Sequence, residues 1–344
     1  MTPQKLLPLS FLLLAACAST HKDADLSLST IPTRIYKTDD GAGTESWVFS
    51  ILVHASDDRT VDPANATLDL FSGDRAVKTI VLSAEALKAV RDVRFKGGGF
   101  TAGAFAAQDE IYDLRHQLTE PIALKVDRVR YRLRFAGGVE KQHDVPILTY
   151  APKTKLISPV KGYFTVINGW VTDRGHTEWS QYFAYDITGL GAPGLDLIKS
   201  NGETNDDYLG WGREVLAPAG GVVVYARNDV GDNPKPGTVD PDSLAKLPDA
   251  MWAVGGNCVV IDHGNGEFSF LAHMQHGSVR VMKGDTIEQG AVIGLLGNSG
   301  NSYAPHLHYH LMAGPAIFRS DPLPSRFENT DVPVPKRGQY LEAK

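Results

Sequence analysis

The sequence is poor in cysteine, has no cluster of positive charge, and contains a single strongly apolar run. Two of its 344 residues are cysteines, Cys17 and Cys258, which excludes a scaffold held by several disulfides. The formal net charge is −6 and no basic block stands out. This argues against a nucleic-acid-binding protein, which normally carries a clustered positive face. Hydrophobic residues make up 42% and charged residues 22% of the chain, which is typical of a globular protein and excludes a mainly disordered one.

Glycine and proline are abundant, and they shape the expected fold. The 34 glycines and 20 prolines favour many turns and short strands, and the length suits two domains. We expect a mainly β protein. A tether over residues 18–27 precedes an accessory β-sandwich over 28–154. A second, antiparallel β-sheet domain with long loops follows over 155–330, and 331–344 form a loose tail.

The apolar run lies at the N-terminus and has the features of a targeting segment. Residues Leu6–Ala16 have about the length of a signal-peptide core and are too short to span a bilayer as a mature helix. The run ends in Leu14-Ala15-Ala16-Cys17, which resembles a bacterial lipobox. The resemblance implies a lipoprotein signal peptide over residues 1–17 and lipid attachment at Cys17. An ordinary secretory signal with an incidental cysteine is the alternative. Ala18 follows the cysteine, so we expect a lipid-anchored protein of the outer membrane that faces the periplasm.

Strand patterns dominate both expected domains. The clearest one alternates apolar residues with arginines: Val129, Tyr131, Leu133 and Phe135 against Arg130, Arg132 and Arg134. The arginines could bind an anionic polymer, although a solvated strand face is the favoured interpretation. One helix is expected over Ala84–Val93. Strands of the second domain are expected at Gly221–Ala226, Asn257–Asp262, Glu267–Ala272, Ala291–Leu296 and Leu307–Met312.

Histidines in the last of these strands point to chemistry. His306, His308 and His310 are spaced two apart, so in a strand their side chains lie on one face while Leu307 and its alternate neighbours face the core. Two imidazoles at this spacing suit one metal ligand and one proton-transfer group. Cys258 stands alone between apolar residues and is expected to be an inert small hydrophobe.

Several blocks of the second domain resemble one known family. They are Asn257–Gly264, Leu271–Met274, Val281–Asp285, Ile293–Ser302 and Pro305–His308. In order and spacing they resemble the core of the lysostaphin-type (LytM-domain) zinc metallopeptidases, which are mostly bacterial peptidoglycan endopeptidases. The resemblance covers roughly residues 212–312 and leaves the expected sandwich outside.

The resemblance implies one zinc ion per chain, held by His176, Asp186 and His308. His176 and Asp186 stand farther apart than the four residues of the commoner form of the family, and Asp173 and Asp196 are nearby alternatives to Asp186. Two histidines and one aspartate leave a coordination position open, which is the pattern of catalytic zinc sites.

Three further histidines receive roles from the same resemblance. His306 and His273 occupy the positions of the family's proton-transfer groups, as amide hydrolysis needs a base and an acid. His310 lies where the family usually carries a glutamate or another polar residue, and we expect it to support a metal ligand.

The expected function is hydrolysis of peptide bonds in peptidoglycan stem or cross-bridge peptides by a zinc-activated water. The main alternative is an inactive LytM-like protein that binds and activates a cell-wall amidase. Such degenerate domains typically lack a ligand, whereas this chain has a candidate at every position. A third alternative is a zinc enzyme that cuts another peptide, because specificity would lie in the loops 190–212 and 228–256. The sequence carries no indication of an oligomeric state.

Overall fold

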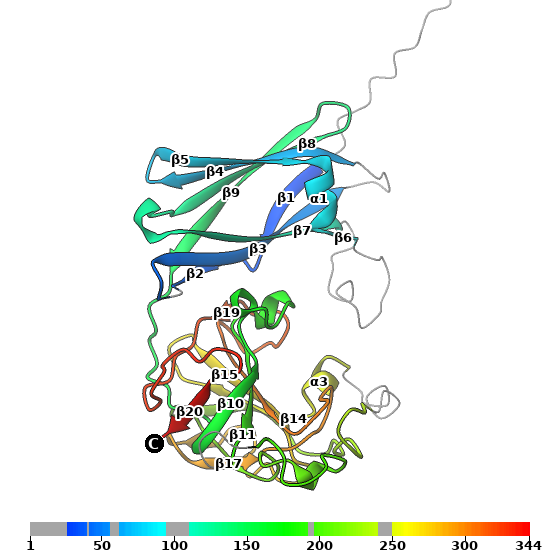
Figure 1. Cartoon of the computed structure of the whole chain (residues 1–344), viewed down its shortest axis with the longest axis vertical. Helices are drawn as coiled ribbons and strands as arrows, with labels where there is room; N and C mark the ends of the chain where they lie inside the picture. The colour runs from blue at the N-terminus through cyan, green and yellow to red at the C-terminus, as the bar shows by residue number, and fades with distance from the viewer. Residues whose placement is uncertain (1–25, 40, 56–61, 94–109, 192–195, 240–249) are drawn as a thin grey trace, which may run out of the picture.

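The computed structural model describes residues 26–39, 41–55, 62–93, 110–191, 196–239 and 250–344. The expected signal peptide, Cys17 and nearly all of the tether therefore lie outside the described residues. The described chain is mainly β, as predicted, with one large sheet in each half (Figure 1). Within this part of the chain, no helix has both the length and the apolar character needed to cross a membrane.

The N-terminal half forms a nine-stranded sheet in the order β5-β4-β8-β9-β2-β3-β7-β6, with β1 also paired to β3. All pairs are antiparallel except β2 with β9. The strands are β1 (Leu26–Ile31), β2 (Ile35–Asp39), β3 (Thr44–Ala55), β4 (Pro63–Ser72), β5 (Arg75–Ser83), β6 (Arg91–Val93), β7 (Glu110–Pro121), β8 (Arg128–Phe135) and β9 (Glu140–Thr149).

This sheet folds over itself around one core. Trp47 and Phe49 of β3 share that core with Leu68 of β4 and Tyr131 of β8, so two layers face each other (Figure 1). The expected helix is shorter than predicted. It is α1 (Ala84–Ala89), and the chain after it turns into β6.

The alternating pattern of β8 is confirmed. Its apolar residues are buried and its arginines point to the other face, where each pairs with an acid. Arg130 lies 2.9 Å from Asp144, and Arg134 lies 3.0 Å from Glu140. Because these charges are already compensated, the structure agrees with a solvated strand face.

The C-terminal half forms a second nine-stranded sheet in the order β16-β13-β14-β15-β18-β11-β10-β20, with β19 paired to β18, and a small sheet of β12 and β17. The strands are β10 (Gly162–Asn168), β11 (Tyr185–Gly189), β12 (Glu214–Leu216), β13 (Gly221–Arg227), β14 (Asn257–Asp262), β15 (Phe268–Met274), β16 (Thr286–Ile287), β17 (Val292–Leu295), β18 (Leu307–Met312), β19 (Pro322–Leu323) and β20 (Tyr340–Ala343). The short helices described in this half are η3 (Val171–Asp173), η4 (Trp179–Gln181), η5 (Asn205–Asp207) and α3 (Ala250–Gly255). In the N-terminal half, η2 (Ile122–Leu124) lies between β7 and β8.

The tail is a correction to the prediction. The sequence predicted a loose segment over 331–344, but Tyr340–Ala343 forms β20 and pairs with β10 at the sheet edge. Leu341 is buried in the main core of this half. Burial of this apolar side chain stabilises the strand, and composition alone does not reveal it.

The two faces of β18 differ as predicted. Leu307, Tyr309 and Leu311 belong to the main core, while His308 and His310 lie on the opposite face, where the ring of Phe270 packs beside both. On neighbouring β14, Cys258 is completely buried among apolar side chains, and burial raises the pKa of its thiol to about 12. It behaves as the expected inert hydrophobe.

Candidate functional site

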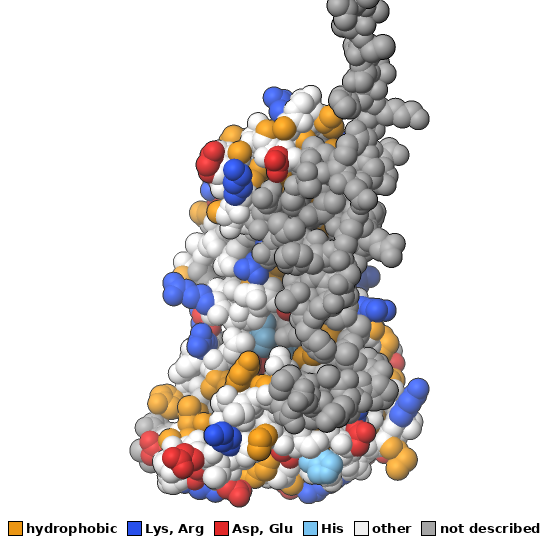
Figure 2. Space-filling model, turned by 90° about the vertical axis from the view of Figure 1, so that its right-hand side faces the viewer, with side chains coloured by type: hydrophobic (Ala, Val, Ile, Leu, Met, Phe, Trp, Pro, Cys, Tyr) orange, Lys and Arg blue, Asp and Glu red, His pale blue; other side chains and the backbone are white. Residues whose placement is uncertain are grey.

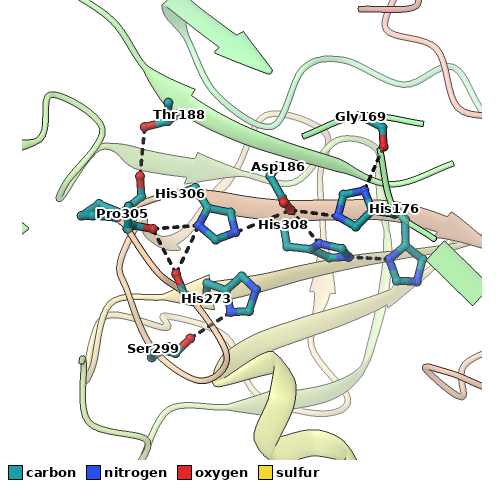
Figure 3. Close-up of polar contacts among 12 residues, drawn as sticks. Gly169, His176, Asp186, Thr188, His273, Ser299, Pro305, His306 and His308 are labelled. Carbon is teal, nitrogen blue, oxygen red and sulfur yellow. Dashed lines mark hydrogen bonds and ion pairs between the residues drawn. The ribbon is translucent and has the colours of Figure 1, made fainter. Parts of the chain in front are cut away.

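Three side chains from separate segments converge beside β18 (Figure 3). Asp186 of β11 and His308 of β18 are direct cross-strand partners, and His308 Nδ1 lies 2.8 Å from Asp186 Oδ1. His176 comes from the segment between β10 and β11, and its Nε2 lies 3.3 Å from the same oxygen. One donor atom from each residue lies within 4.8 Å of the other two. The structure thus brings together the three residues that the resemblance implied as metal ligands.

The segment that carries His176 is held by its own backbone. The carbonyl oxygen of Gly169 accepts hydrogen bonds from the backbone N–H of His176 at 2.9 Å and from its Nδ1 at 3.0 Å. Gly175 must be a glycine, because a Cβ there would lie 1.7 Å from that carbonyl oxygen. Since Nδ1 donates to a carbonyl, the proton of a neutral His176 is on Nδ1 and the lone pair of Nε2 faces Asp186. A histidine that binds a metal through Nε2 requires this tautomer.

The ring of His308 is oriented by His310, through the other ring nitrogen. His308 Nε2 lies 2.9 Å from His310 Nδ1, and both side chains are buried. When Nε2 of His308 donates to Nδ1 of His310, the lone pair of His308 Nδ1 faces Asp186. His310 Nε2 then carries that ring's proton, and it has no hydrogen-bond partner among the described residues.

The electrostatics of the cluster keep Asp186 ionised. Burial opposes the charge of Asp186, but the charge of His306 and the polar contacts with His176, His306 and His308 outweigh it and hold the pKa of the carboxyl well below its usual range. Burial lowers the pKa of His308. Burial also disfavours the charged form of His176, but the hydrogen bond and charge of Asp186 raise the pKa of that ring. A largely buried carboxylate surrounded by imidazoles is a suitable donor set for a cation.

His306 and His273 border the ligand cluster, and each is oriented through Nδ1. His306 Nδ1 donates to the carbonyl of Ala304 at 2.7 Å, and its Nε2 lies 3.5 Å from Asp186 Oδ1. His273 Nδ1 donates to the carbonyl of Ser299 at 2.8 Å. The two ring centroids are 4.7 Å apart. In both rings Nε2 is therefore left as the atom that can accept a proton.

A β-bulge turns His273 toward the site. Between β14 and β15 the register shifts, since Asn257 pairs with Met274 while Val259 pairs with Leu271. His273 adopts a left-handed backbone with φ 63°, which is uncommon outside glycine. In an unbroken strand His273 would point away from the face of its neighbour Ala272. Bulges commonly re-aim a side chain in this way.

The loop before β18 is held by buried amides that the sequence analysis did not single out. Asn233 Nδ2 donates to the carbonyls of Asn298, Gly300 and Ser302 at 2.8 to 3.0 Å. Asp232 accepts from the backbone N–H of Asn298 at 2.9 Å. This network fixes the loop that supplies the carbonyls for His306 and His273. The dense run of Asn, Ser and Gly at 297–302 was the available sequence signal for it.

The site opens into a cavity of about 330 Å³. Asn168, Gln181 and Asn301 line its polar part, while Phe270 and Phe318 belong to its apolar wall. Among the described residues that line it, none is Lys or Arg. On the face shown in Figure 2, the described Lys and Arg side chains are scattered singly among Asp and Glu, without a continuous basic patch.

The alternatives to these residues lie elsewhere. Asp173 accepts from the backbone of Arg337, and Asp196 is exposed, so neither joins the histidine cluster. His263 bonds to the Gly220 carbonyl and Ser269, and His276 bonds to the Val230 carbonyl. The other histidines that the structure describes, His54, His116 and His143, belong to strands of the N-terminal sheet.

Comparison with curated proteins gives short matches. The "Peptidoglycan DD-endopeptidase ShyA" of Vibrio cholerae serotype O1 is 36% identical over 90 residues, covering 25% of this chain and 19% of ShyA. "Peptidoglycan DD-endopeptidase ShyC" of the same organism is 32% identical over 84 residues, covering 21% of this chain and 19% of ShyC. The matched region thus spans about a fifth of the length of these curated relatives.

Solved structures with detectable similarity are distant. A zinc-containing peptidase from Vibrio cholerae is 12% identical, with 86% of this chain and 83% of that chain covered and a TM-score of 0.26. The catalytic domain of lysostaphin from Staphylococcus simulans is 20% identical, with 38% and 86% covered and a TM-score of 0.22.

The family model that matches is that of peptidase family M23, over residues 208–318. This range includes His273, His306 and His308, whereas His176 and Asp186 precede it and lie beside His308 in the structure. The C-terminal part of the chain therefore contains a peptidase domain of family M23.

Proposed function

We propose that the protein is a zinc-dependent endopeptidase that hydrolyses peptide bonds in bacterial peptidoglycan. The observation that carries the proposal is the convergence of His176, Asp186 and His308, whose donor atoms lie within 4.8 Å of one another at the wall of an open cavity. His306 and His273 line the same cavity, and each ring is held through Nδ1 by a backbone carbonyl. Residues 208–318, which include His273, His306 and His308, match the model of peptidase family M23.

The donor set fits zinc. Two imidazole nitrogens and one carboxylate oxygen are typical protein ligands of catalytic zinc. The Gly169 carbonyl and His310 direct the lone pairs of the two imidazoles toward Asp186, as metal-ligand histidines require. When bound, zinc polarises the scissile carbonyl and makes a water more acidic.

The remaining steps fall to the side chains of this chain. Amide hydrolysis needs a group that takes a proton from the attacking water and a group that gives one to the leaving amine. Nε2 of His306 and Nε2 of His273 can hold that proton, because Nδ1 of each ring donates to a backbone carbonyl. The apolar wall with Phe270 and Phe318 excludes water from one side of the bound peptide.

Peptidoglycan is proposed as the substrate for two reasons. Both curated relatives are named peptidoglycan DD-endopeptidases. The lipobox-like end of the apolar run at Cys17 would tether the protein to the outer membrane, facing the periplasm and the cell wall.

Replacement of Cys17 by Ser tests the tether. It should move the protein into the soluble periplasm or leave an unprocessed precursor. Unchanged membrane association with normal processing would contradict lipid attachment.

The alternative of an inactive, amidase-activating protein is less well supported, since no candidate ligand or proton-transfer residue is missing. Purified sacculi provide the test, with release of new amine termini measured with and without a zinc chelator. We expect chelator-sensitive release by the wild type. We also expect loss of zinc and of activity in His176→Ala and in His308→Ala. Full zinc occupancy in either variant would overturn the ligand assignment. Zinc binding without any amine release would favour the regulator.

A further inference from the structure

The N-terminal domain contacts the segment that carries His176. Arg115 of β7 donates from Nη1 to the carbonyl oxygen of Thr177 at 3.0 Å, and Thr177 directly follows His176 in the chain. Val48 of β3 forms a small apolar cluster with Val171 and Tyr182. Both contacts fall between β10 and β11, the stretch that delivers His176 to Asp186.

The burial of β3 shows that this contact is part of the fold. In a two-layered β domain the outward face of a strand is commonly solvated. The residues of β3 that face the domain core alternate with Val48 and Ser50, yet Val48 is 5% and Ser50 1% exposed. Ser50 is the cross-strand partner of Arg115 and hydrogen-bonds to Tyr182. Figure 1 shows β3 in the layer of the N-terminal sheet that is nearer the C-terminal half.

The tip of the contacted segment is held by local turn hydrogen bonds, in which the backbone N–H groups of Gly175 and His176 donate to the carbonyls of Trp170 and Gly169. On the inner side, Trp170 packs against Phe183 and Tyr185, and the backbone N–H of Val171 donates to the Tyr182 carbonyl at 2.9 Å. The tip with His176 is not part of a strand or helix and follows η3. A segment of this kind opens locally at low cost unless a second surface packs against it.

We propose that the N-terminal domain is a positioning element for the metal site: β3 and Arg115 hold the segment 169–184 so that His176 reaches Asp186. This inference rests on the assignment of His176 as a ligand under the proposed function. Loss of a group that orients a metal ligand without binding the metal itself typically lowers metal affinity by about 10–100-fold. The N-terminal domain thereby acts on metal retention without contributing a ligand of its own.

The test uses the full chain with the paired substitutions Val48→Ala and Arg115→Ala. We measure zinc affinity by competition with a chelator, and hydrogen exchange of residues 169–184 in the metal-free protein. Zinc affinity should fall about 10-fold or more, and the backbone N–H of His176, which bonds to the Gly169 carbonyl, should exchange faster. Arg115→Lys keeps a donor near Thr177 and should retain more affinity than Arg115→Ala.

The control is Arg134→Ala, which removes an exposed arginine of β8 that pairs with Glu140 on another part of the N-terminal domain. It should leave zinc affinity and exchange unchanged. Unchanged affinity and exchange in the double variant would overturn the inference, as would a gain in activity without a change in zinc affinity. If the wild type itself binds no zinc, the proposed function fails. If the wild type binds zinc and the variants bind it with the same affinity, only the present inference fails.

Discussion

His310 offers the sharpest test of the proposed metal site, because its effect is exerted through one hydrogen bond. His310→Leu removes the acceptor for His308 Nε2, which lies 2.9 Å from His310 Nδ1, and keeps an apolar side chain of similar size. His310→Gln is the matched control, because its side-chain oxygen can still accept. Loss of the acceptor lets His308 place its proton on Nδ1, the atom that faces Asp186.

Two independent estimates give the size of the effect. Removing an outer partner of a metal ligand costs about 10–100-fold in metal affinity, which corresponds to about 1.4–2.8 kcal/mol. Leaving a buried donor unpaired costs about 1–3 kcal/mol, and His308 is buried. We therefore expect zinc affinity to fall 10–100-fold in His310→Leu, with a smaller fall in His310→Gln.

The assay is competition for zinc with a chelator at fixed pH, with thermal unfolding of the metal-free variants as a check on packing. Zinc affinity in His310→Leu equal to that of the wild type would refute the reasoning. If His310→Leu loses zinc completely while His308→Ala keeps it, the ligand on this strand is His310 and the proposed assignment is wrong.

Three further predictions concern residues around the site and in the N-terminal core. His306→Ala and His273→Ala should each keep zinc and lose about 10²–10⁴-fold in rate; full activity in either variant would show that the residue is structural. Gly175→Ala places a Cβ 1.7 Å from a backbone oxygen and should abolish zinc binding, measured as zinc content. Gly231→Ala places a Cβ with nothing within 4 Å and is the control for the zinc content of Gly175→Ala and for the rates of the histidine variants. Burial lowers the pKa of His116 from 6.5 to about 4, so the unfolded chain binds more protons between these values and stability falls as the pH drops through this window. Relative to His116→Gln, the wild type should lose up to about 3 kcal/mol between pH 7 and pH 4, and equal pH profiles in chemical unfolding would contradict this.

Local patterns predicted much of the fold. The alternation in β8 predicted its buried and exposed faces residue by residue, and the strands Asn257–Asp262 and Leu307–Met312 have the predicted bounds. Side-chain alternation follows from the backbone of a single strand, so no tertiary information is required. The helix predicted over Ala84–Val93 ends early and the tail contains a strand. These differences arise because pairing partners far along the chain decide both segments.

The candidate site shows the same division. The sequence by itself determined that His308 and His310 share one face, because that depends only on the period of a strand. Tertiary structure alone decided that His308 meets Asp186, 122 residues away, through the pairing of β11 with β18. It also decided that a bulge turns His273 into the cavity.

The groups that orient the candidate ligands could not be predicted from the sequence either. The Gly169 carbonyl that orients His176 and the Arg115 guanidinium that contacts Thr177 are ordinary groups in the sequence. They have these roles because the folded chain brings them next to His176 and Thr177. The sequence determines which chemical groups are available and which face of a strand they occupy. Long-range strand pairing and domain packing determine which of them meet, because the free energy of those contacts depends on residues that are remote along the chain.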